Sequence, residues 1–356
     1  MALKIAMSTQ RQSLRQSCLL SLIAVSFSLA SCTSNSKNST NVFLTGAGAT
    51  FPAPLYQGWF AMYNQQHPNV KINYQSNGSG TGISQFIQGT VDFAASDVAI
   101  TEEQAAKVKR GAIALPMTAG AIVIAYNLPK VATSLKLPRA VYTDIFLGKI
   151  KTWNDPRIAK ANPEVQLPDL PILVVHRSDG SGTTSVFTQH LNAISQEWKN
   201  KVGAGKAIAW PIGIGAKGNE GVTAHIQQFA GTIGYVEYSY AVQNNLSMAA
   251  LENKAGRYIM PTIDSAAKTL EKIELPSQNL IAFITDPADP QSYPIVTYTW
   301  LLSYQKYQDP RKAQVIKNFV DWALTKGQKY SIELGYIPLP KEVVTKVKSA
   351  SEKISE

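Results

Sequence analysis

Cysteine is almost absent from this chain of 356 residues, which contains only Cys18 and Cys32. Because both precede residue 33, the rest of the chain has no internal disulfide and no metal site built on cysteine. The histidines are also few, and these four follow no metal-ligand spacing: His67, His176, His190 and His225. The sequence therefore predicts neither a disulfide framework nor a metal centre.

The N-terminal region lacks an apolar run long enough to span a membrane. Its apolar residues, 18–30, follow a basic start with Lys4, Arg11 and Arg15 and end in small residues. A short apolar run between such flanks is typical of a secretory signal peptide. We therefore interpret residues 1–31 as a signal peptide that is removed on export.

The run Leu29-Ala30-Ser31-Cys32 resembles a bacterial lipobox, in which cleavage before the cysteine exposes it for lipid attachment. This motif predicts an exported protein, lipidated at Cys32 and held at the periplasmic or cell-surface face of a membrane. The alternative is plain signal cleavage, with Cys32 incidental. The polar residues 32–41 are expected to form a flexible tether that spans about 15–18 Å.

Acidic residues are fewer than basic ones, with 24 Asp+Glu against 34 Lys+Arg and a net charge of +10. Loss of three basic residues with the signal peptide leaves 31 Lys+Arg, and therefore a net charge of +7. A basic protein is a candidate for nucleic-acid binding, but export argues against that partner and the lysines are spread along the chain. We interpret the excess as a weak attraction for small anions and anionic lipid.

Nucleotide-binding and serine-hydrolase motifs are missing as well. No G-x-x-x-x-G-K-[ST] occurs, and no G-x-G-x-x-G follows a strand with an acidic partner. The turn at 45–50 comes nearest, but Phe51 stands where the third glycine belongs. Ser79 and Ser181 lack the glycines at −2 and +2 that surround the nucleophile of serine hydrolases.

What the chain does contain is a succession of strand and helix patterns, which predicts an α/β fold with mostly parallel sheets. Apolar runs at 112–126 and 293–304 predict buried strands, the first of them partly parallel. Residues 311–326 predict an amphipathic helix that Gly327 ends. Residues 245–290 show no clear pattern. Ligands of such sheets bind beyond the carboxyl ends of the strands.

Three glycine-rich turns, at residues 45–51, 78–81 and 180–183, each follow a strand pattern and precede a helix pattern. Free backbone N–H groups and the positive end of a helix dipole favour anions at such turns. Any one turn alone is better explained as an ordinary turn with a helix cap. Together with Arg177, and with Asp97 at a strand end, they predict one shared anion site.

Arg177 has a planar fork of donors suited to an oxyanion. Asp179, two residues later, is placed to hold that fork. His176, next to Arg177, is interpreted as a flanking residue rather than a catalytic base.

Several segments, in the right order along nearly the whole mature chain, closely resemble the phosphate-binding lipoproteins of bacterial ATP-driven phosphate importers. They are TGAGATFPAP (45–54), VDFAASD (91–97), LGKIKTWND (147–155), RSDGSGTT (177–184), WKNKVGAGKAIAWPIGIGAKGNEGV (198–222) and GTIGYVEYSYA (231–241). The resemblance implies a type II periplasmic-binding-protein fold with two discontinuous lobes, 42–116 plus 292–356 and 117–291, joined by hinge strands. It also implies closure on one inorganic phosphate ion, no cofactor, and delivery to transmembrane permease subunits.

The resemblance implies a role for each matching residue. On one lobe, Thr50 and Phe51 would donate through backbone N–H groups, with the Thr50 hydroxyl, Ser79 and Asp97 beside them. On the other lobe, Arg177 would bind phosphate, Asp179 would orient it, and a cradle would be completed by Ser181, Gly182 and Thr183. Departures from the family pattern are His176 in place of a basic residue, Gly80-Thr81 in place of Gly and Ser, and a shortened 245–290.

A carboxylate in an anion site is explained if the ligand carries a proton that it can donate to Asp97. Phosphate carries such a proton near neutral pH and sulfate does not, so Asp97 is expected to select phosphate. The alternative function is a secreted phosphoesterase or phosphotransferase with Ser181 or Thr183 as nucleophile. It requires a base or metal near the nucleophile, and the sequence offers only His176. A third hypothesis is an exported adhesion or sensor protein that keeps the clamp without transport.

Overall fold

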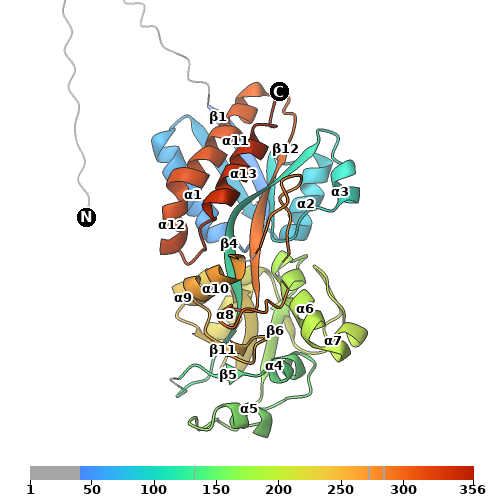
Figure 1. The fold of residues 1–356 in the computed structure, drawn as a ribbon, viewed down its shortest axis with the longest axis vertical. Helices are drawn as coiled ribbons and strands as arrows, with labels where there is room; N and C mark the ends of the chain where they lie inside the picture. The colour runs from blue at the N-terminus through green and yellow to red at the C-terminus, as the bar shows by residue number, and fades with distance from the viewer. Residues whose placement is uncertain (1–40, 132, 272, 284) are drawn as a thin grey trace, which may run out of the picture. The chain divides into compact units, whose positions relative to one another are not determined.

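The computed structural model describes residues 41–131, 133–271, 273–283 and 285–356 (Figure 1). The predicted signal peptide, the lipidation residue Cys32 and the tether up to residue 40 lie outside the described residues. Among the described residues, no helix has the length and apolar character needed to cross a membrane.

A nine-stranded sheet organises the chain, in the order β2-β1-β3-β12-β4-β8-β6-β7, with β9 paired to β4. β1 is parallel to β2 and β3, and β6 is parallel to β7 and β8, whereas the central β4 and β12 are antiparallel to their neighbours. The strands are β1 Val42–Gly48, β2 Val70–Ser76, β3 Phe93–Ser96, β4 Ala112–Tyr126, β6 Leu173–Arg177, β7 Ile214–Ala216, β8 Thr232–Glu237, β9 Ser247–Met248 and β12 Val296–Tyr304.

β4 joins two halves of this sheet. Its residues up to Ala121 pair with β12, and its residues from Ile122 onward pair with β8. We call β2, β1, β3, β12 and the start of β4 the first half-sheet, and the end of β4 with β9, β8, β6 and β7 the second half-sheet. The expectation that 112–126 is partly parallel is wrong, because all pairings of β4 are antiparallel. Its continuous apolar character comes from nearly complete burial, not from parallel pairing.

Helices cover both half-sheets, as Figure 1 shows. α1, α11, α12 and α13 lie on the first half-sheet, whereas α6, α7 and α8 lie with the second. The helices are α1 Ala53–Gln66, α2 Ser79–Gln88, α3 Glu102–Ala106, α4 Arg139–Phe146, α5 Pro156–Ala161, α6 Gly182–Ile194, α7 Gln196–Lys201, α8 Gly218–Gln228, α9 Tyr238–Gln243, α10 Ile263–Leu270, α11 Pro310–Trp322, α12 Gln328–Glu333 and α13 Lys341–Ser351.

The helix predicted for 311–326 does not end at Gly327. α11 passes at Ala323 into one π-helical segment, Ala323–Gly327, and the chain continues directly as α12. Gly327 is needed for close packing instead: its carbonyl accepts a hydrogen bond from Trp59 Nε1 (3.0 Å), and a Cβ there would lie 3.1 Å from that ring. The glycine therefore allows α1 to pack closely against this helical segment and does not act as a C-cap.

The segment 245–290, for which the sequence showed no pattern, forms small elements beside the second half-sheet. β10 (Ala250–Glu252) pairs with β11 (Tyr258–Ile259) and with β5 (Lys136–Leu137) in a three-stranded sheet. The strands are too short for the periodicity of their side chains to be recognised.

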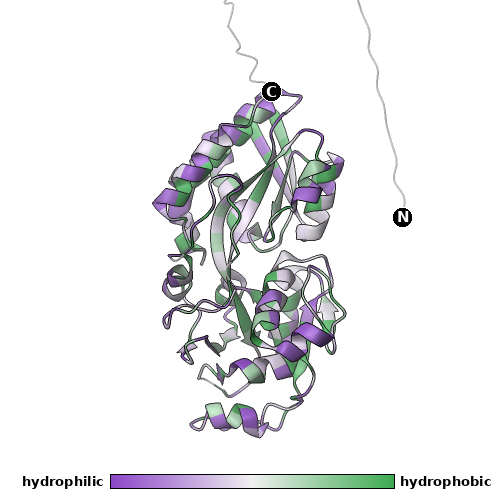
Figure 2. Cartoon of the chain, turned by 45° about the vertical axis from the view of Figure 1, so that its right-hand side comes forward, coloured by the Kyte–Doolittle hydropathy of each residue, from purple (hydrophilic) through white to green (hydrophobic). Residues whose placement is uncertain are grey.

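Apolar residues fill the space between strands and helices, and the outer faces of the helices are polar (Figure 2). All of Trp59, Trp153, Trp198 and Trp300 are fully buried. Trp153 donates through Nε1 to the Gly231 carbonyl (2.9 Å), so the buried indole keeps its hydrogen bond.

Candidate anion-binding site

The first half-sheet contributes three turns at the carboxyl ends of β1, β2 and β3. Thr50 and Phe51 occupy the turn between β1 and α1, and both are buried. Gly48 at the end of β1 has φ 142°, and a Cβ there would lie 2.1 Å from the Ala95 carbonyl, so the close approach of β1 and β3 requires glycine.

Ser79 begins α2 and Asp97 directly follows β3. Both are buried. The hydroxyl of Ser79 accepts a hydrogen bond from the Asp97 N–H (3.3 Å), and Asp97 Oδ1 accepts one from Thr299 Oγ1 (2.9 Å) on β12. Asp97 is thus held by neighbours from two elements of the first half-sheet.

The second half-sheet contributes Arg177 at the end of β6. Its guanidinium donates through Nε to Asp179 Oδ1 (2.8 Å) and through Nη2 to Asp179 Oδ2 (2.5 Å). Asp179 Oδ1 also accepts from the Gly218 N–H (3.0 Å) at the start of α8. A two-point pair of this kind fixes the plane of the guanidinium, as the two-residue spacing led us to expect.

The turn 180–183 leads into α6 and places small residues next to Arg177. Ser181 is the N-cap of α6 and accepts the Thr184 N–H at 3.0 Å. Thr183 Oγ1 lies 3.4 Å from Arg177 Nη1. At Gly182, an added Cβ would lie 2.5 Å from Ser79 Oγ, so only glycine permits this approach of the two half-sheets.

The two half-sheets contact each other around these residues. The Gly80 N–H donates to the Gly180 carbonyl (2.7 Å), so the two GSGT turns touch. Thr183 Oγ1 donates to Asp97 Oδ2 at 3.4 Å. Thr50, Phe51, Ser79, Asp97, Arg177, Asp179, Ser181, Gly182 and Thr183 are therefore brought together in one buried region.

Burial and charge act in opposite directions on the ionisable groups here. Burial raises the pKa of Asp97 to about 7, against the hydrogen bond from Thr299 and the positive charge of Arg177. Burial also disfavours charge on Arg177 and Asp179, but their mutual hydrogen bonds and attraction dominate. They raise the pKa of Arg177 and lower that of Asp179. The site therefore combines a fixed cation with a carboxyl group that changes charge near neutral pH.

His176 is the base that the alternative phosphoesterase function would require. The His176 ring stacks on Trp210 at 4.8 Å between centroids, and its Nδ1 lies 3.1 Å from the Arg177 carbonyl oxygen. This arrangement agrees with a flanking role. Within the described ranges, no group of three or more His, Cys, Asp and Glu residues is arranged to hold a metal ion.

Comparison with known proteins identifies the family. The model of the PBP superfamily domain matches residues 31–326. Phosphate-binding protein PstS of Pasteurella multocida (strain Pm70) is 42% identical over 330 residues, which cover 92% of this chain and 94% of that protein. The PstS of Methanocaldococcus jannaschii is 40% identical over 355 residues and covers 91% of each chain. The chain belongs to the PstS family of phosphate-binding proteins.

Solved structures agree with this PstS assignment at the level of the fold. The phosphate binding protein of Stenotrophomonas maltophilia superposes with a TM-score of 0.68 at 19% identity, over 86% of this chain and 93% of that one. An ABC-type phosphate transport receptor from Vibrio cholerae gives 0.54 at 20% identity, over 83% and 100%. The predicted two-lobed α/β fold is confirmed.

Asn219, at the start of α8, was not predicted as a site residue. It is fully buried and donates through Nδ2 to Thr50 Oγ1 (2.8 Å) and to Thr183 Oγ1 (3.4 Å). Its Oδ1 accepts the Glu237 N–H at 3.0 Å. Asn219 lies in the glycine-rich segment 213–222, a fourth turn before a helix, and that pattern is the signal that could have identified it.

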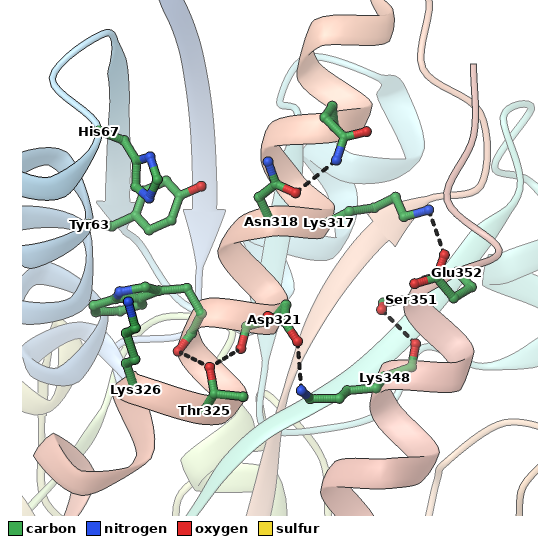
Figure 3. A pocket seen from close by; sticks show the side chains of 12 residues that line it. Tyr63, His67, Lys317, Asn318, Asp321, Thr325, Lys326, Lys348, Ser351 and Glu352 are labelled. Atoms are coloured by element: carbon green, nitrogen blue, oxygen red, sulfur yellow. Dashed lines mark hydrogen bonds and ion pairs between the residues drawn. The ribbon is translucent and has the colours of Figure 1, made fainter.

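A second concave region lies on the outer side of the first half-sheet, between α1, α11 and α13 (Figure 3). Two of its three lysines are paired with carboxylates, because Lys317 pairs with Glu352 and Lys348 pairs with Asp321, both at 2.7 Å. It therefore lacks the concentrated positive charge that Arg177 gives the buried site.

Proposed function

We propose that this protein binds one inorganic phosphate ion between its half-sheets and delivers it to an ATP-driven membrane importer. The observation that carries the proposal is the position of Asp97, a buried carboxyl group linked through Thr183 to the fixed guanidinium of Arg177. An anion that is attracted by Arg177 must also form a hydrogen bond with Asp97. The PstS relatives, named as phosphate-binding proteins, support the choice of ligand.

Each site residue has a distinct task in this proposal. The backbone N–H groups of Thr50 and Phe51 donate to phosphate oxygens, and so do the hydroxyl groups of Thr50 and Ser79. Arg177 donates from the opposite side, held in its plane by Asp179. The N-terminus of α6 completes the cradle with Ser181, Gly182 and Thr183, where free N–H groups and the helix dipole favour negative charge.

Asp97 accepts a hydrogen bond from the O–H group that phosphate carries. Both HPO₄²⁻ and H₂PO₄⁻ have an O–H group to donate, whereas sulfate presents only oxygens and leaves a buried carboxylate unpaired. An unmatched buried polar group costs far more than a satisfied one gains, which makes this contact selective.

The magnitude of binding is bounded by the size of the ligand. Phosphate has five heavy atoms, and about 1.5 kcal/mol per atom gives a ceiling of about −7.5 kcal/mol for a small ligand. This corresponds to a Kd on the order of micromolar. A Kd below that value requires hydrogen-bond donors that are already fixed in place, as the Arg177 guanidinium is by its pair with Asp179.

We further propose that the lobes divide as 42–116 plus 292–356 and 117–291. The shift of β4 from β12 to β8 occurs between residues 121 and 122, a few residues beyond the proposed boundary at 116, and supports a hinge in this part of β4. The partners are the permease subunits and, through the lipid on Cys32, a membrane. The basic start and short apolar run of residues 1–31 support export, and loss of membrane association in Cys32→Ser tests the anchor.

We propose no enzymatic activity. Ser181 Oγ serves as the cap of α6, and the Thr183 hydroxyl lies between Arg177 and Asp97, so both hydroxyls have structural partners. Turnover of a generic phosphate ester that disappears in Ser181→Ala would support the alternative phosphoesterase function.

Calorimetric titration of the purified protein with phosphate tests the proposal. One phosphate per chain is expected, with little or no heat of binding for sulfate. Equal binding of the two anions by the unmutated protein contradicts the assignment of Asp97.

A further inference from the structure

Glu237 is a fully buried carboxyl group at the last residue of β8, opposite Ile122, where β4 changes partners. Its Oε2 accepts the Ser239 N–H at 2.8 Å and also contacts the Ser239 hydroxyl. Its Oε1 is buried and has no hydrogen-bond partner among the described residues. No residue of the described chain forms an ion pair with Glu237, so a negative charge there would be uncompensated.

Hydrogen-bond directions behind the anion site give the protonation state of this group. The Phe51 carbonyl can only accept, so Tyr336, whose hydroxyl lies 2.7 Å away, donates its single proton to it. Ser239 Oγ must then donate its own proton to the Tyr336 hydroxyl, which lies 2.9 Å away. The remaining contact, between Ser239 Oγ and Glu237, is a hydrogen bond only if Glu237 supplies the proton.

We propose that Glu237 is kept protonated and heads a hydrogen-bond chain, Glu237–Ser239–Tyr336–Phe51, that positions the turn carrying Thr50 and Phe51. Glu237 is a positioning residue in this proposal, since it donates to Ser239 and not to the anion. The inference rests on the proposed function, because it assigns a support to the phosphate-binding turn.

The same residue reaches the turn by a second route. The Glu237 N–H donates to Asn219, and Asn219 donates to the hydroxyl of Thr50. The side chain and the backbone of Glu237 therefore fix two adjacent residues of one turn, each through intermediaries. Because the turn follows β1 and Glu237 ends β8, these contacts also join the two half-sheets.

The groups around Glu237 favour its neutral form. It is faced by the hydroxyls of Ser239 and Tyr336, by the charge of Asp97, and by Tyr238 and Tyr240, none of which is a cation. Burial raises the pKa of Glu237 well above its ordinary value, and the negative charge of Asp97 raises it further, while the contacts with Ser239 and Tyr336 oppose this only in part. A neutral acid is the state that this environment stabilises.

Infrared spectroscopy tests the protonation directly. In an Asp97→Asn background, which removes the other carboxyl group with a strongly raised pKa, the C=O band of a protonated carboxylic acid is expected at neutral pH. The band should disappear on the additional change Glu237→Gln. Its absence at neutral pH overturns the inference. Because this readout involves no phosphate, it is independent of whether the unmutated protein binds phosphate.

Phosphate titration tests the positioning role. Tyr336→Phe removes one link of the chain without touching the anion, and we expect phosphate affinity to fall roughly fivefold to tenfold, the effect of one net hydrogen bond. Tyr298→Phe is the matched control, because the buried Tyr298 hydroxyl has no partner among the described residues; its affinity should be unchanged. Equal phosphate affinities of folded Tyr336→Phe and Tyr298→Phe would overturn the proposal that this hydrogen-bond chain positions the turn.

Glu237→Gln gives an independent check, because its amide can still donate to Ser239 Oγ. It should weaken binding less than Glu237→Met, which has a similar volume and no donor. If Gln weakens binding as much as Met does, Glu237 acts as an ionised acceptor and the proposed direction of the chain is wrong.

Discussion

Asp97 and Arg177 show how burial acts differently on two groups in one site. Arg177 stays charged because Asp179 supplies two hydrogen bonds and an opposite charge. Asp97 has mainly hydroxyl partners, Thr299 and Thr183, and burial raises its pKa to about 7. The positive member of the site is therefore permanent, whereas the negative member depends on pH and on the ligand.

The raised pKa of Asp97 predicts how stability depends on pH. Between its ordinary value of 3.8 and about 7, the folded ligand-free protein holds a proton on Asp97 that the unfolded chain has lost. The free energy of unfolding should therefore fall as pH rises through this window and level off above it. Urea unfolding of the wild type and of Asp97→Asn across pH 4–8 measures the effect, and the variant should lose this part of the slope. Parallel curves would contradict the prediction.

Asn219 is expected to matter although it was not identified as a binding residue from the sequence. Asn219→Ala leaves the hydroxyl of Thr50 and the N–H of Glu237 without their buried partner. Phosphate affinity should fall roughly tenfold, the cost of an unsatisfied buried group. Asn318→Ala is the control, since the exposed Asn318 side chain pairs, among the described residues, only with Gln314. Equal affinities for the two variants in a phosphate titration would argue against this role.

At the scale of elements, local patterns predicted the turns and the strand or helix on either side of them. Helices α1 and α6 come after the glycine-rich turns at 45–51 and 180–183, as expected. The antiparallel pairing of β4 and the continuation beyond Gly327 were not predicted, because both depend on partners distant in the sequence. Strand β12, which pairs with β4, lies more than 150 residues away. Trp59 and Gly327 are similarly separated, by 268 positions.

The start of α6 gives a prediction for a glycine whose importance is not local. Gly182 has an ordinary helical backbone, so Gly182→Ala should leave the fold intact, but its Cβ would meet Ser79 and Asp97 across the site. We expect phosphate affinity to fall by about tenfold or more. In Gly58→Ala, the added Cβ meets only Leu334 at 3.6 Å, and affinity should not change. A normal affinity in Gly182→Ala would show that the half-sheets do not need this approach.

At the scale of the whole molecule, the site exists only where the two half-sheets meet. The turns and the resemblance predicted nine residues that the structure brings together, but the sequence could not predict the contacts that join the halves. Glu237 and Tyr336 are examples, because each reaches the Thr50–Phe51 turn from a segment far along the chain. Their role depends on tertiary contacts that no local pattern encodes.

Because phosphate is expected to bind the folded protein alone, it should stabilise it by mass action. At a free concentration of 100 times Kd, the free energy of unfolding should rise by about 2.7 kcal/mol. Thermal unfolding with phosphate, and with sulfate at equal ionic strength, measures the difference. An equal shift with both anions would indicate a general salt effect.

The ratio of the sulfate and phosphate dissociation constants, in the wild type and in Asp97→Asn, tests the proposed selectivity most directly. At pH 9, about two units above the pKa of Asp97, phosphate should bind to the wild type roughly a hundredfold more tightly, since sulfate binding then requires the buried Asp97 to take up a proton. In Asp97→Asn the amide can donate to either anion, and the ratio should approach one. A ratio that is unchanged by the substitution would contradict the assignment of selectivity to Asp97.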